Sequence, residues 1–254
     1  MRTIRPHTHA ERVKLLPAVV RRLEDRFGDG LLSVAVGGSF ARGDDGPYSD
    51  IDVVAIIAPD APRADEPGTV EILEGQFVDI PYWTVDDLLR PLREPRSDWC
   101  FWATRRLVAV TNPLVVEHVE RESAALIARA RRPADPLHER LVALAAERLG
   151  YEVPEHVGKL LNACQPGRPH VERGLLLPRA LHEVLVTVAL LNAWPYPDLT
   201  AILDDAPRLS IRPPGLLELC ALCRSRDAEA AALAAAFLTV VAGLEELLLG
   251  PRRL

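Results

Sequence analysis

The chain has 254 residues, of which 48% are hydrophobic and 26% are charged. This length and composition are typical of one large globular domain or two modest ones, and they exclude a disordered or fibrous protein. With 30 lysines and arginines against 36 aspartates and glutamates, the formal charge is −6, so the chain lacks the basic field of a nucleic-acid-binding protein and would attract a cationic substrate.

The composition also predicts a cytoplasmic protein with no membrane segment. Four cysteines are too few for a disulfide framework in a chain of this length, and the polar residues 1–12 do not form a signal peptide. The longest apolar stretch, Ala230 to Leu244, is shorter than the roughly 20 residues that span a bilayer. We therefore expect this stretch to form a packed helix.

The first periodic segment covers residues 8–27 and predicts a helix. Its apolar residues recur at spacings of three and four, at Val13, Leu16, Val20, Leu23 and Phe27. Thr8 and Glu11 have the spacing of a capping box at its start. Pro17 lies too deep for a first-turn proline, so we expect it to kink the helix or delay its start. The preceding His7-Thr8-His9 is interpreted as a frayed terminus.

Strand patterns dominate the next part of the chain. The expected strands are Leu31 to Val36, Ile51 to Ile57, Val70 to Leu73, Phe77 to Trp83 and Arg106 to Val110. The sharp Gly37-Gly38-Ser39 segment follows the first of them, and Glu74-Gly75-Gln76 between the third and fourth predicts a hairpin. Thr84 is expected to cap a short helix that ends near Leu92.

From residue 114 to the end, proline and glycine separate a series of helical patterns. The predicted helices are Leu114 to Arg131, Leu137 to Leu149, Glu155 to Ala163, Val171 to Trp194, Gly215 to Arg224 and Ala228 to Leu249. An α/β N-terminal half therefore precedes an all-helical C-terminal half. We expect two domains, residues 1–130 and 131–254, whose cores meet over a cleft.

A set of acidic residues carries the most specific chemical signal. Gly38-Ser39 is followed after ten residues by Asp50-Ile51-Asp52, and Asp79 lies on a later predicted strand. Because residues i and i+2 of a strand project to the same face, Asp50 and Asp52 should point together, with Ile51 in the core. Like charges held that close repel each other unless a cation lies between them. With Asp79 they would form a triad of oxygen ligands suited to Mg²⁺.

The Gly38-Ser39 turn would supply the other half of such a site. Glycines let the backbone approach a ligand and aim N–H groups at phosphate oxygens, while the Ser39 hydroxyl adds a donor and Arg42 adds positive charge. A glycine-serine turn alone is commonplace, and an Asp-x-Asp alone is more often a solvated strand end. Together they agree in order, element type and facing, which favours phosphoryl-type transfer.

At these residues the sequence resembles the DNA polymerase β-like nucleotidyltransferase superfamily, whose signature is Gly-Ser, a gap, Asp-x-Asp or Asp-x-Glu, and a later strand acid. Gly46 to Asp52, the preceding Arg42 to Asp45 and the Ser97-Asp98-Trp99 triplet resemble the kanamycin nucleotidyltransferase family, the aminoglycoside 4′-O-nucleotidyltransferases. Glu155-His156-Val157-Gly158-Lys159 is similar to the Glu-x-x-Gly-Lys segment of that family. The likeness extends from Thr8 to at least Trp194.

This resemblance implies an α+β fold, in which a polymerase-β-like nucleotidyltransferase domain with a mixed sheet precedes an all-helical domain. It implies Mg²⁺-dependent transfer of AMP from ATP, or of another nucleoside monophosphate from its triphosphate, with release of pyrophosphate. The implied catalytic metal ligands are Asp50, Asp52 and Asp79. The implied triphosphate-binding residues are Gly38, Ser39, Arg42, Ser49 and Lys159. Glu155 would be the general base that takes the proton from the attacking hydroxyl.

The implied acceptor is an aminoglycoside antibiotic, modified at its 4′-hydroxyl, with no nucleic-acid or membrane partner. A homodimer with active sites at the subunit interface is also implied, with Glu155 acting in its own site or in the partner's. Glu155 and Lys159 share a helix face at i and i+4, although without the upstream motif they would be an exposed ion pair. The family carries glutamate where this chain has Asp52 and Asp79, so both acids here are one methylene shorter.

Two alternatives stay open from the sequence. The same chemistry could serve a different small molecule or a protein side chain as the acceptor. The chain could instead be a non-catalytic nucleotide-binding or antitoxin-like module. The presence of Ser39, Asp50, Asp52 and Asp79 and the full helical domain count against this second alternative.

Overall fold

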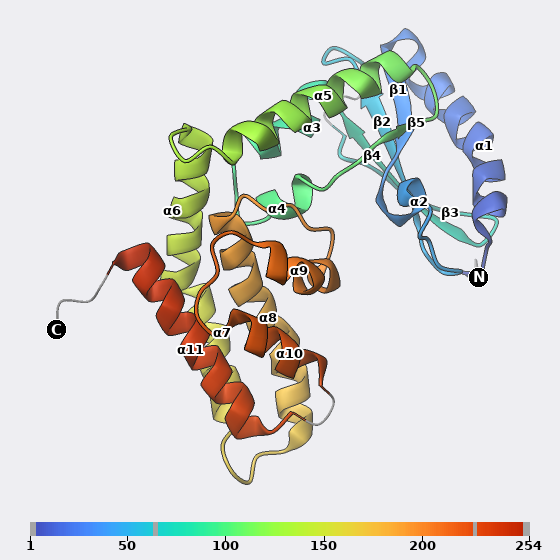
Figure 1. Ribbon diagram of the computed structural model, residues 1–254. Helices are drawn as coiled ribbons and strands as arrows, with labels where there is room; N and C mark the ends of the chain where they lie inside the picture. Colours follow the sequence, from blue (N-terminus) through green and yellow to red (C-terminus); the bar gives the residue numbers. More distant parts are fainter. Residues whose placement is uncertain (1–3, 63–65, 226–227, 251–254) are drawn as a thin grey trace. The chain divides into compact units, whose positions relative to one another are not determined.

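The computed structural model describes residues 4–62, 66–225 and 228–250 and shows two compact units (Figure 1). Unit 1 consists of the described residues of Met1–Arg93 and Arg105–Leu126, and unit 2 of those of Glu94–Thr104 and Ile127–Leu254. Within the described ranges, strands occur only in unit 1, whereas unit 2 is helical. This arrangement confirms the predicted α+β class.

Unit 1 is built on a mixed five-stranded sheet with the order β3-β4-β2-β1-β5. The strands are β1 Leu31–Val36, β2 Ile51–Ile57, β3 Gly68–Leu73, β4 Gln76–Trp83 and β5 Val108–Ala109. β2 pairs with β4 in parallel, and the other three pairings are antiparallel. The bounds of β1 and β2 match the prediction. The last strand is shorter than predicted, because the amides of Val110 and Thr111 both turn to the carbonyl of Val34 and end the ladder.

Helix α1, His9–Phe27, lies alongside this sheet (Figure 1) and buries one stripe of side chains. The Thr8–Glu11 capping box is confirmed, and the helix runs through Pro17 without a delayed start. The buried stripe is rotated relative to the predicted one, since Val13 is 45% exposed. Its members are Arg12, Leu15, Leu16, Val19, Leu23 and Phe27. The unexpected member is Arg12, a charged side chain in an otherwise apolar row.

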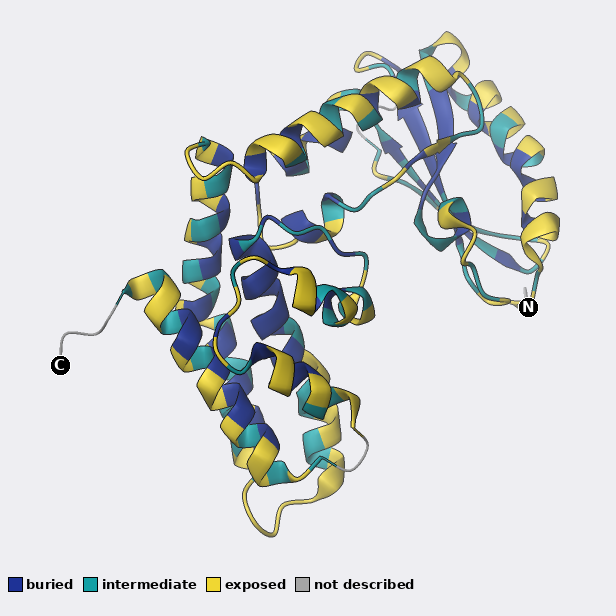
Figure 2. Ribbon diagram, viewed as in Figure 1, coloured by how far each residue is buried: buried dark blue, intermediate teal, exposed yellow. Residues whose placement is uncertain are grey.

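The core of unit 1 lies between α1 and one face of the sheet, where the central strands are buried (Figure 2). β4 alternates strictly between buried and half-buried residues. Val78, Ile80 and Tyr82 therefore enter the core, while Asp79 and Trp83 project from the opposite face. This alternation decides which side of the sheet carries the polar chemistry.

Three helices complete unit 1: α2 Gly38–Arg42, α3 Val85–Arg93 and the first part of α5 Pro113–Ala130, which continues into unit 2. The predicted turn at Gly37-Gly38-Ser39 opens directly into the short α2. Thr84 caps α3 as predicted, because its hydroxyl accepts the amide proton of Asp87 at 3.1 Å. The hairpin between β3 and β4 is also confirmed, with positive φ at Glu74 and Gly75.

Unit 2 is a helical bundle in which α8 takes the central place. Its helices are α4 Trp99–Trp102, the end of α5, α6 Pro136–Gly150, α7 Glu152–Ala163, α8 His170–Leu191, α9 Leu199–Asp205, α10 Leu216–Arg224 and α11 Ala230–Leu249. The six predicted helices are present, with shifted ends. α8 stops before Trp194, since Ala193 adopts a positive φ of 44°. The short α4 and α9 were not predicted, because neither is long enough to show a helical period.

Two helices of unit 2, α8 and α11, are long and apolar enough to cross a membrane by length and composition alone. Such helices also form the cores of globular bundles. The second half of α8 is buried on nearly all sides. α11 extends the apolar stretch predicted at residues 230–244 and buries one face, including Phe237, Val240 and Leu244. α8 therefore has the burial of a core helix, whereas α11 packs against the bundle with one face.

Candidate active site

The three predicted acids come together at neighbouring strands of unit 1. Asp52 of β2 is in register with Asp79 of β4 in the parallel ladder, so both project from the same face of the sheet. Asp50 directly precedes β2, and Ile51 is fully buried, as predicted. Strands pair about 4.8 Å apart, so the ladder brings the two carboxylates close to each other.

Burial and neighbouring charges both act on the carboxylate of Asp52. Burial raises the pKa of Asp52, and the charges of Asp50 and Asp79 raise it further, while Arg105 and Arg42 act in the opposite direction. A half-buried carboxylate among like charges is a group that a bound cation would stabilise. The metal site itself stays a prediction.

The glycine turn lies directly against this carboxylate. Gly38 has φ +60°, and a Cβ atom added there would lie 1.8 Å from Oδ2 of Asp52. The amide of Gly37 donates to the carbonyl of Asp52 at 2.8 Å. Only a residue without a side chain leaves room for Asp52 in this conformation.

The remaining predicted residues of unit 1 lie on α2 and on the loop before Asp50. Ser39 is half-buried, and within the described part of the chain its hydroxyl makes no hydrogen bond to another residue. Arg42 pairs with Asp44, Nε to Oδ2, at 3.0 Å. The hydroxyl oxygen of Ser49 accepts the amide proton of Gly46 at 2.9 Å. Ser49 therefore shapes its own loop while its hydroxyl proton stays available to a ligand.

Arg105 is a further cation of this site that sequence reasoning missed. Its guanidinium carbon lies 4.0 Å from the centre of the Trp83 ring, on the face of β4 that carries Asp79. Burial lowers the pKa of Arg105 to about 10, against the opposing effect of the Asp52 and Asp79 charges. The only signal in the sequence was a basic pair, Arg105-Arg106, ahead of a weak strand. No motif marks it.

A large cavity of unit 1 lies away from the acids. It measures about 1040 Å³ and opens between α1 and the β3–β4 hairpin, where Lys14, Arg22 and Glu74 are among the lining residues. None of the predicted site residues lines it. Charge and register, rather than concavity, identify the candidate site.

Replacing Gly38 with alanine is expected to lower transfer by at least about 100-fold, because the new methyl group must displace the Asp52 carboxylate. The fold should lose only about 1 to 2 kcal/mol, the cost of a left-handed alanine, since the Asp52 side chain can rotate away. Gly43→Ala is the matched control, because Gly43 has φ +74° with open space around its Cβ position. Equal activity losses in the two variants would contradict this role of Gly38. Steady-state kinetics and thermal melts report both effects.

In unit 2, Glu155 and Lys159 form the predicted pair on α7. Nζ of Lys159 lies 2.6 Å from Oε1 of Glu155, and the two side chains are 53% and 35% exposed. The hydrogen bond and charge of Lys159 lower the pKa of Glu155. Glu155 is consequently ionised at neutral pH, as a proton acceptor must be.

A second group of possible metal ligands lies beside this pair. Among the described residues, only Glu152, Glu155 and His156 bring three such ligand atoms within 4.8 Å of one another. Nδ1 of His156 is 2.9 Å from the carbonyl of Glu152, and Nε2 accepts from Arg179 at 3.3 Å. Both ring nitrogens are thus engaged, so we assign no metal here. The three aspartates of unit 1 do not meet this distance criterion among the described residues.

Comparison with known proteins finds nucleotidyltransferases. Residues 16–95 match the family described as "Nucleotidyltransferase domain". Two proteins named "Aminoglycoside nucleotidyltransferase (4')", from Staphylococcus aureus and Bacillus sp, are each 25% identical over 214 residues, which cover 84% of this chain and 80% of theirs. The crystal structure of a nucleotidyltransferase-like protein from Exiguobacterium sibiricum covers 92% of this chain and 73% of that chain, with 13% identity and a TM-score of 0.45.

Proposed function

We propose, from the premise that this chain is a transferase with a nucleotidyltransferase domain, that it transfers a nucleoside monophosphate, AMP in the first instance, to the 4′-hydroxyl of an aminoglycoside. The observation that carries the proposal is the convergence of Asp50, Asp52 and Asp79 beside the Gly38 turn, all within the matched residues 16–95. The names of the relatives and the net charge of −6 support a polycationic acceptor.

The acids of this site fit a magnesium ion. Their donors are hard carboxylate oxygens, and the raised pKa of Asp52 shows negative charge that nearby cations do not balance. We infer that Asp50, Asp52 and Asp79 hold Mg²⁺. When bound, the ion would neutralise charge that develops on the triphosphate during transfer.

The triphosphate would lie along the glycine turn. The backbone at Gly38 and the hydroxyl of Ser39 would donate to its oxygens, and Ser49 would add a second hydroxyl proton. The positive charges of Arg42 and Lys159 would bind the phosphates, which requires each to leave its carboxylate partner, Asp44 or Glu155. Each predicted binding residue thus supplies a specific donor or positive charge to the triphosphate.

Glu155 would act as the general base. The acceptor oxygen attacks the α-phosphorus, the bond between the α-phosphorus and the bridging oxygen breaks, and pyrophosphate leaves. The hydroxyl proton passes to the ionised Glu155. Release of Lys159 towards the phosphates would at the same moment make Glu155 a stronger base, because the contact that lowers its pKa is lost.

We further propose a cytoplasmic homodimer, with Glu155 acting in its own or its partner's site and with no nucleic-acid or membrane partner.

A mass-spectrometric screen tests the proposal. The purified protein is incubated with ATP, Mg²⁺ and a panel of aminoglycosides that includes one without a 4′-hydroxyl. We expect adducts that carry one AMP on compounds with a 4′-hydroxyl and no adduct on the compound that lacks it. Modification of that compound would move the reaction to another hydroxyl. Labelling of the protein itself by radiolabelled ATP, with no drug adduct, would favour a protein side chain as the acceptor. Failure to bind or turn over any triphosphate would indicate a non-catalytic module.

A further inference from the structure

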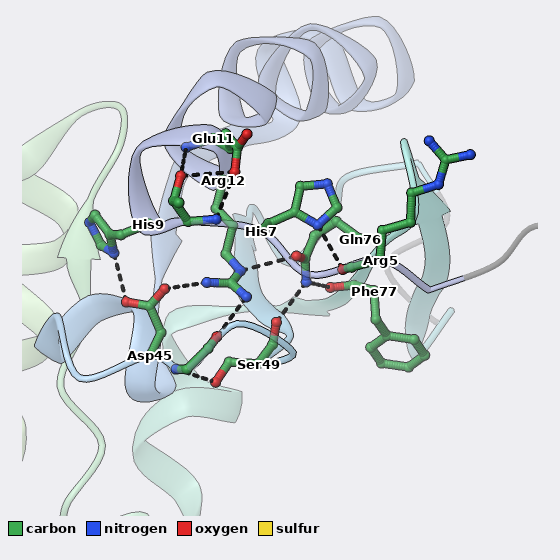
Figure 3. A network of polar contacts seen from close by, with 11 residues as sticks. Arg5, His7, His9, Glu11, Arg12, Asp45, Ser49, Gln76 and Phe77 are labelled. Carbon is green, nitrogen blue, oxygen red and sulfur yellow. Dashed lines mark hydrogen bonds and ion pairs between the residues drawn. The ribbon is translucent and has the colours of Figure 1, made fainter.

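Arg12 is a fully buried arginine that none of the proposed catalytic steps uses. Its side chain is 0% exposed, and its guanidinium donates to three partners (Figure 3). Nε donates to Oε1 of Gln76 at 3.0 Å, Nη1 to Oδ2 of Asp45 at 2.5 Å, and Nη2 to the carbonyl of Gly46 at 2.7 Å. A buried charge is retained only where such partners satisfy it.

Gln76 extends these contacts to the residue before Asp50. Its Nε2 donates to the carbonyl of Ser49 at 2.7 Å and to that of Phe77 at 3.0 Å. The loop is closed on itself between Gly46 and Ser49, whose backbone and hydroxyl contacts are 3.1 and 2.9 Å long. Residues 45–49 are therefore attached to α1 and β4 by side chains and not by strand or helix pairing.

The first turn of α1 also contacts the helix that follows the glycine turn. His9 lies 2.7 Å from Asp45, Nδ1 to Oδ1, and its ring stacks on Phe40 of α2 with centroids 4.6 Å apart. The amide of His7 donates to the carbonyl of Pro47 at 2.8 Å. Residues 7–9, predicted to be frayed, thus contact both α2 and the loop before Asp50.

We propose that Arg12 is a positioning residue, which through Asp45, Gly46 and Gln76 holds the loop before Asp50 ready for the metal and triphosphate. The inference rests on the proposed function of that loop. Its physical basis is preorganisation: a loop fixed before binding loses less conformational freedom when the ligand arrives. The planar guanidinium suits this task, since it directs donors to three acceptors that one lysine ammonium would not reach together.

Gln76→Glu tests this role with little change in volume. The new carboxylate still accepts from Arg12, but it no longer donates to the carbonyl of Ser49. We expect binding of Mn²⁺ in the presence of α,β-methylene-ATP, followed by electron paramagnetic resonance, to weaken by about tenfold or more. The kcat for transfer should fall by about 10- to 100-fold, while the KM for the aminoglycoside stays within about twofold. Arg12→Lys, which keeps the charge beside Asp45, should show the same split.

Arg22→Gln is the matched control. It removes another contact between α1 and the sheet, the 2.5 Å ion pair of Arg22 with Glu71, far along the helix from the loop. Its Mn²⁺ binding and kcat should equal those of the wild type. The positioning role would be overturned if Gln76→Glu and Arg12→Lys both fold and bind Mn²⁺ as tightly as the wild type does. It would also be overturned if neither variant folds. If the wild-type protein itself neither binds Mn²⁺ with the nucleotide nor transfers, the proposed function fails first.

Discussion

Asp52→Asn is expected to reduce nucleotidyl transfer by at least about 1,000-fold, because the variant loses a ligand of the metal that stabilises the transition state. The same change should make the metal-free protein more stable at neutral pH. An amide of the same size keeps the packing beside Gly38. It also removes a negative charge that burial and the neighbouring acids destabilise. Loss of activity with a gain of stability is the pattern expected of a residue retained for function.

The pH dependence of this gain follows from the direction of the pKa shift. Burial, together with Asp50 and Asp79, raises the pKa of Asp52 above 3.8. The folded protein then binds this proton more tightly than the unfolded chain does, so stability falls as pH rises from the ordinary value through the raised one. Thermal melts of wild type and variant should therefore differ most at neutral pH and converge in acid.

Asp60→Asn is the control for charge alone, since Asp60 lies on an exposed loop of unit 1. It should change neither activity nor the melting temperature. Magnesium with a non-hydrolysable triphosphate should raise the melting temperature of the wild type but not that of Asp52→Asn. Retained turnover in Asp52→Asn would exclude Asp52 as a metal ligand, and a lower melting temperature at neutral pH would show that its charge is well compensated.

Glu155→Gln is expected to lower kcat by about 100- to 10,000-fold, because an amide cannot take the proton of the attacking hydroxyl. The KM for the triphosphate should change little, since Lys159 keeps its charge. Glu172→Gln on α8 is a matched control: it breaks an i,i+4 pair with Arg168 and changes the net charge equally. An unchanged kcat in Glu155→Gln would move the base elsewhere, with Asp79 as the next candidate.

Lys159→Gln separates the two roles of this helix face. Without the ammonium, the pKa of Glu155 should rise towards its ordinary value, because the hydrogen bond and charge that lower it are gone. The acid limb of the kcat/KM–pH profile, which reports the free enzyme, should therefore move to higher pH, and the KM for the triphosphate should increase. An acid limb that stays in place would show that Glu155 does not set it.

Local periodicity determined most of the secondary structure. Strands β1 and β2, the hairpin at Glu74-Gly75, the cap at Thr8 and the long helices of unit 2 all follow from patterns contained within one element. The i and i+2 spacing of Asp50 and Asp52, and the i and i+4 spacing of Glu155 and Lys159, are of the same kind. Each of these predictions needs only the geometry of a single strand or helix.

Contacts between distant segments decided the rest. The register that sets Asp52 beside Asp79 depends on how two strands pair, and the position of Arg105 depends on the chain returning to the sheet after α3. Nothing in its local pattern predicts that Arg12 is buried, because a charged side chain enters the interior only where remote groups satisfy all of its donors. The sequence alone therefore determined which acids are proposed for the site. Only the tertiary structure decided which cations lie near them and which contacts hold the loop before Asp50 in place.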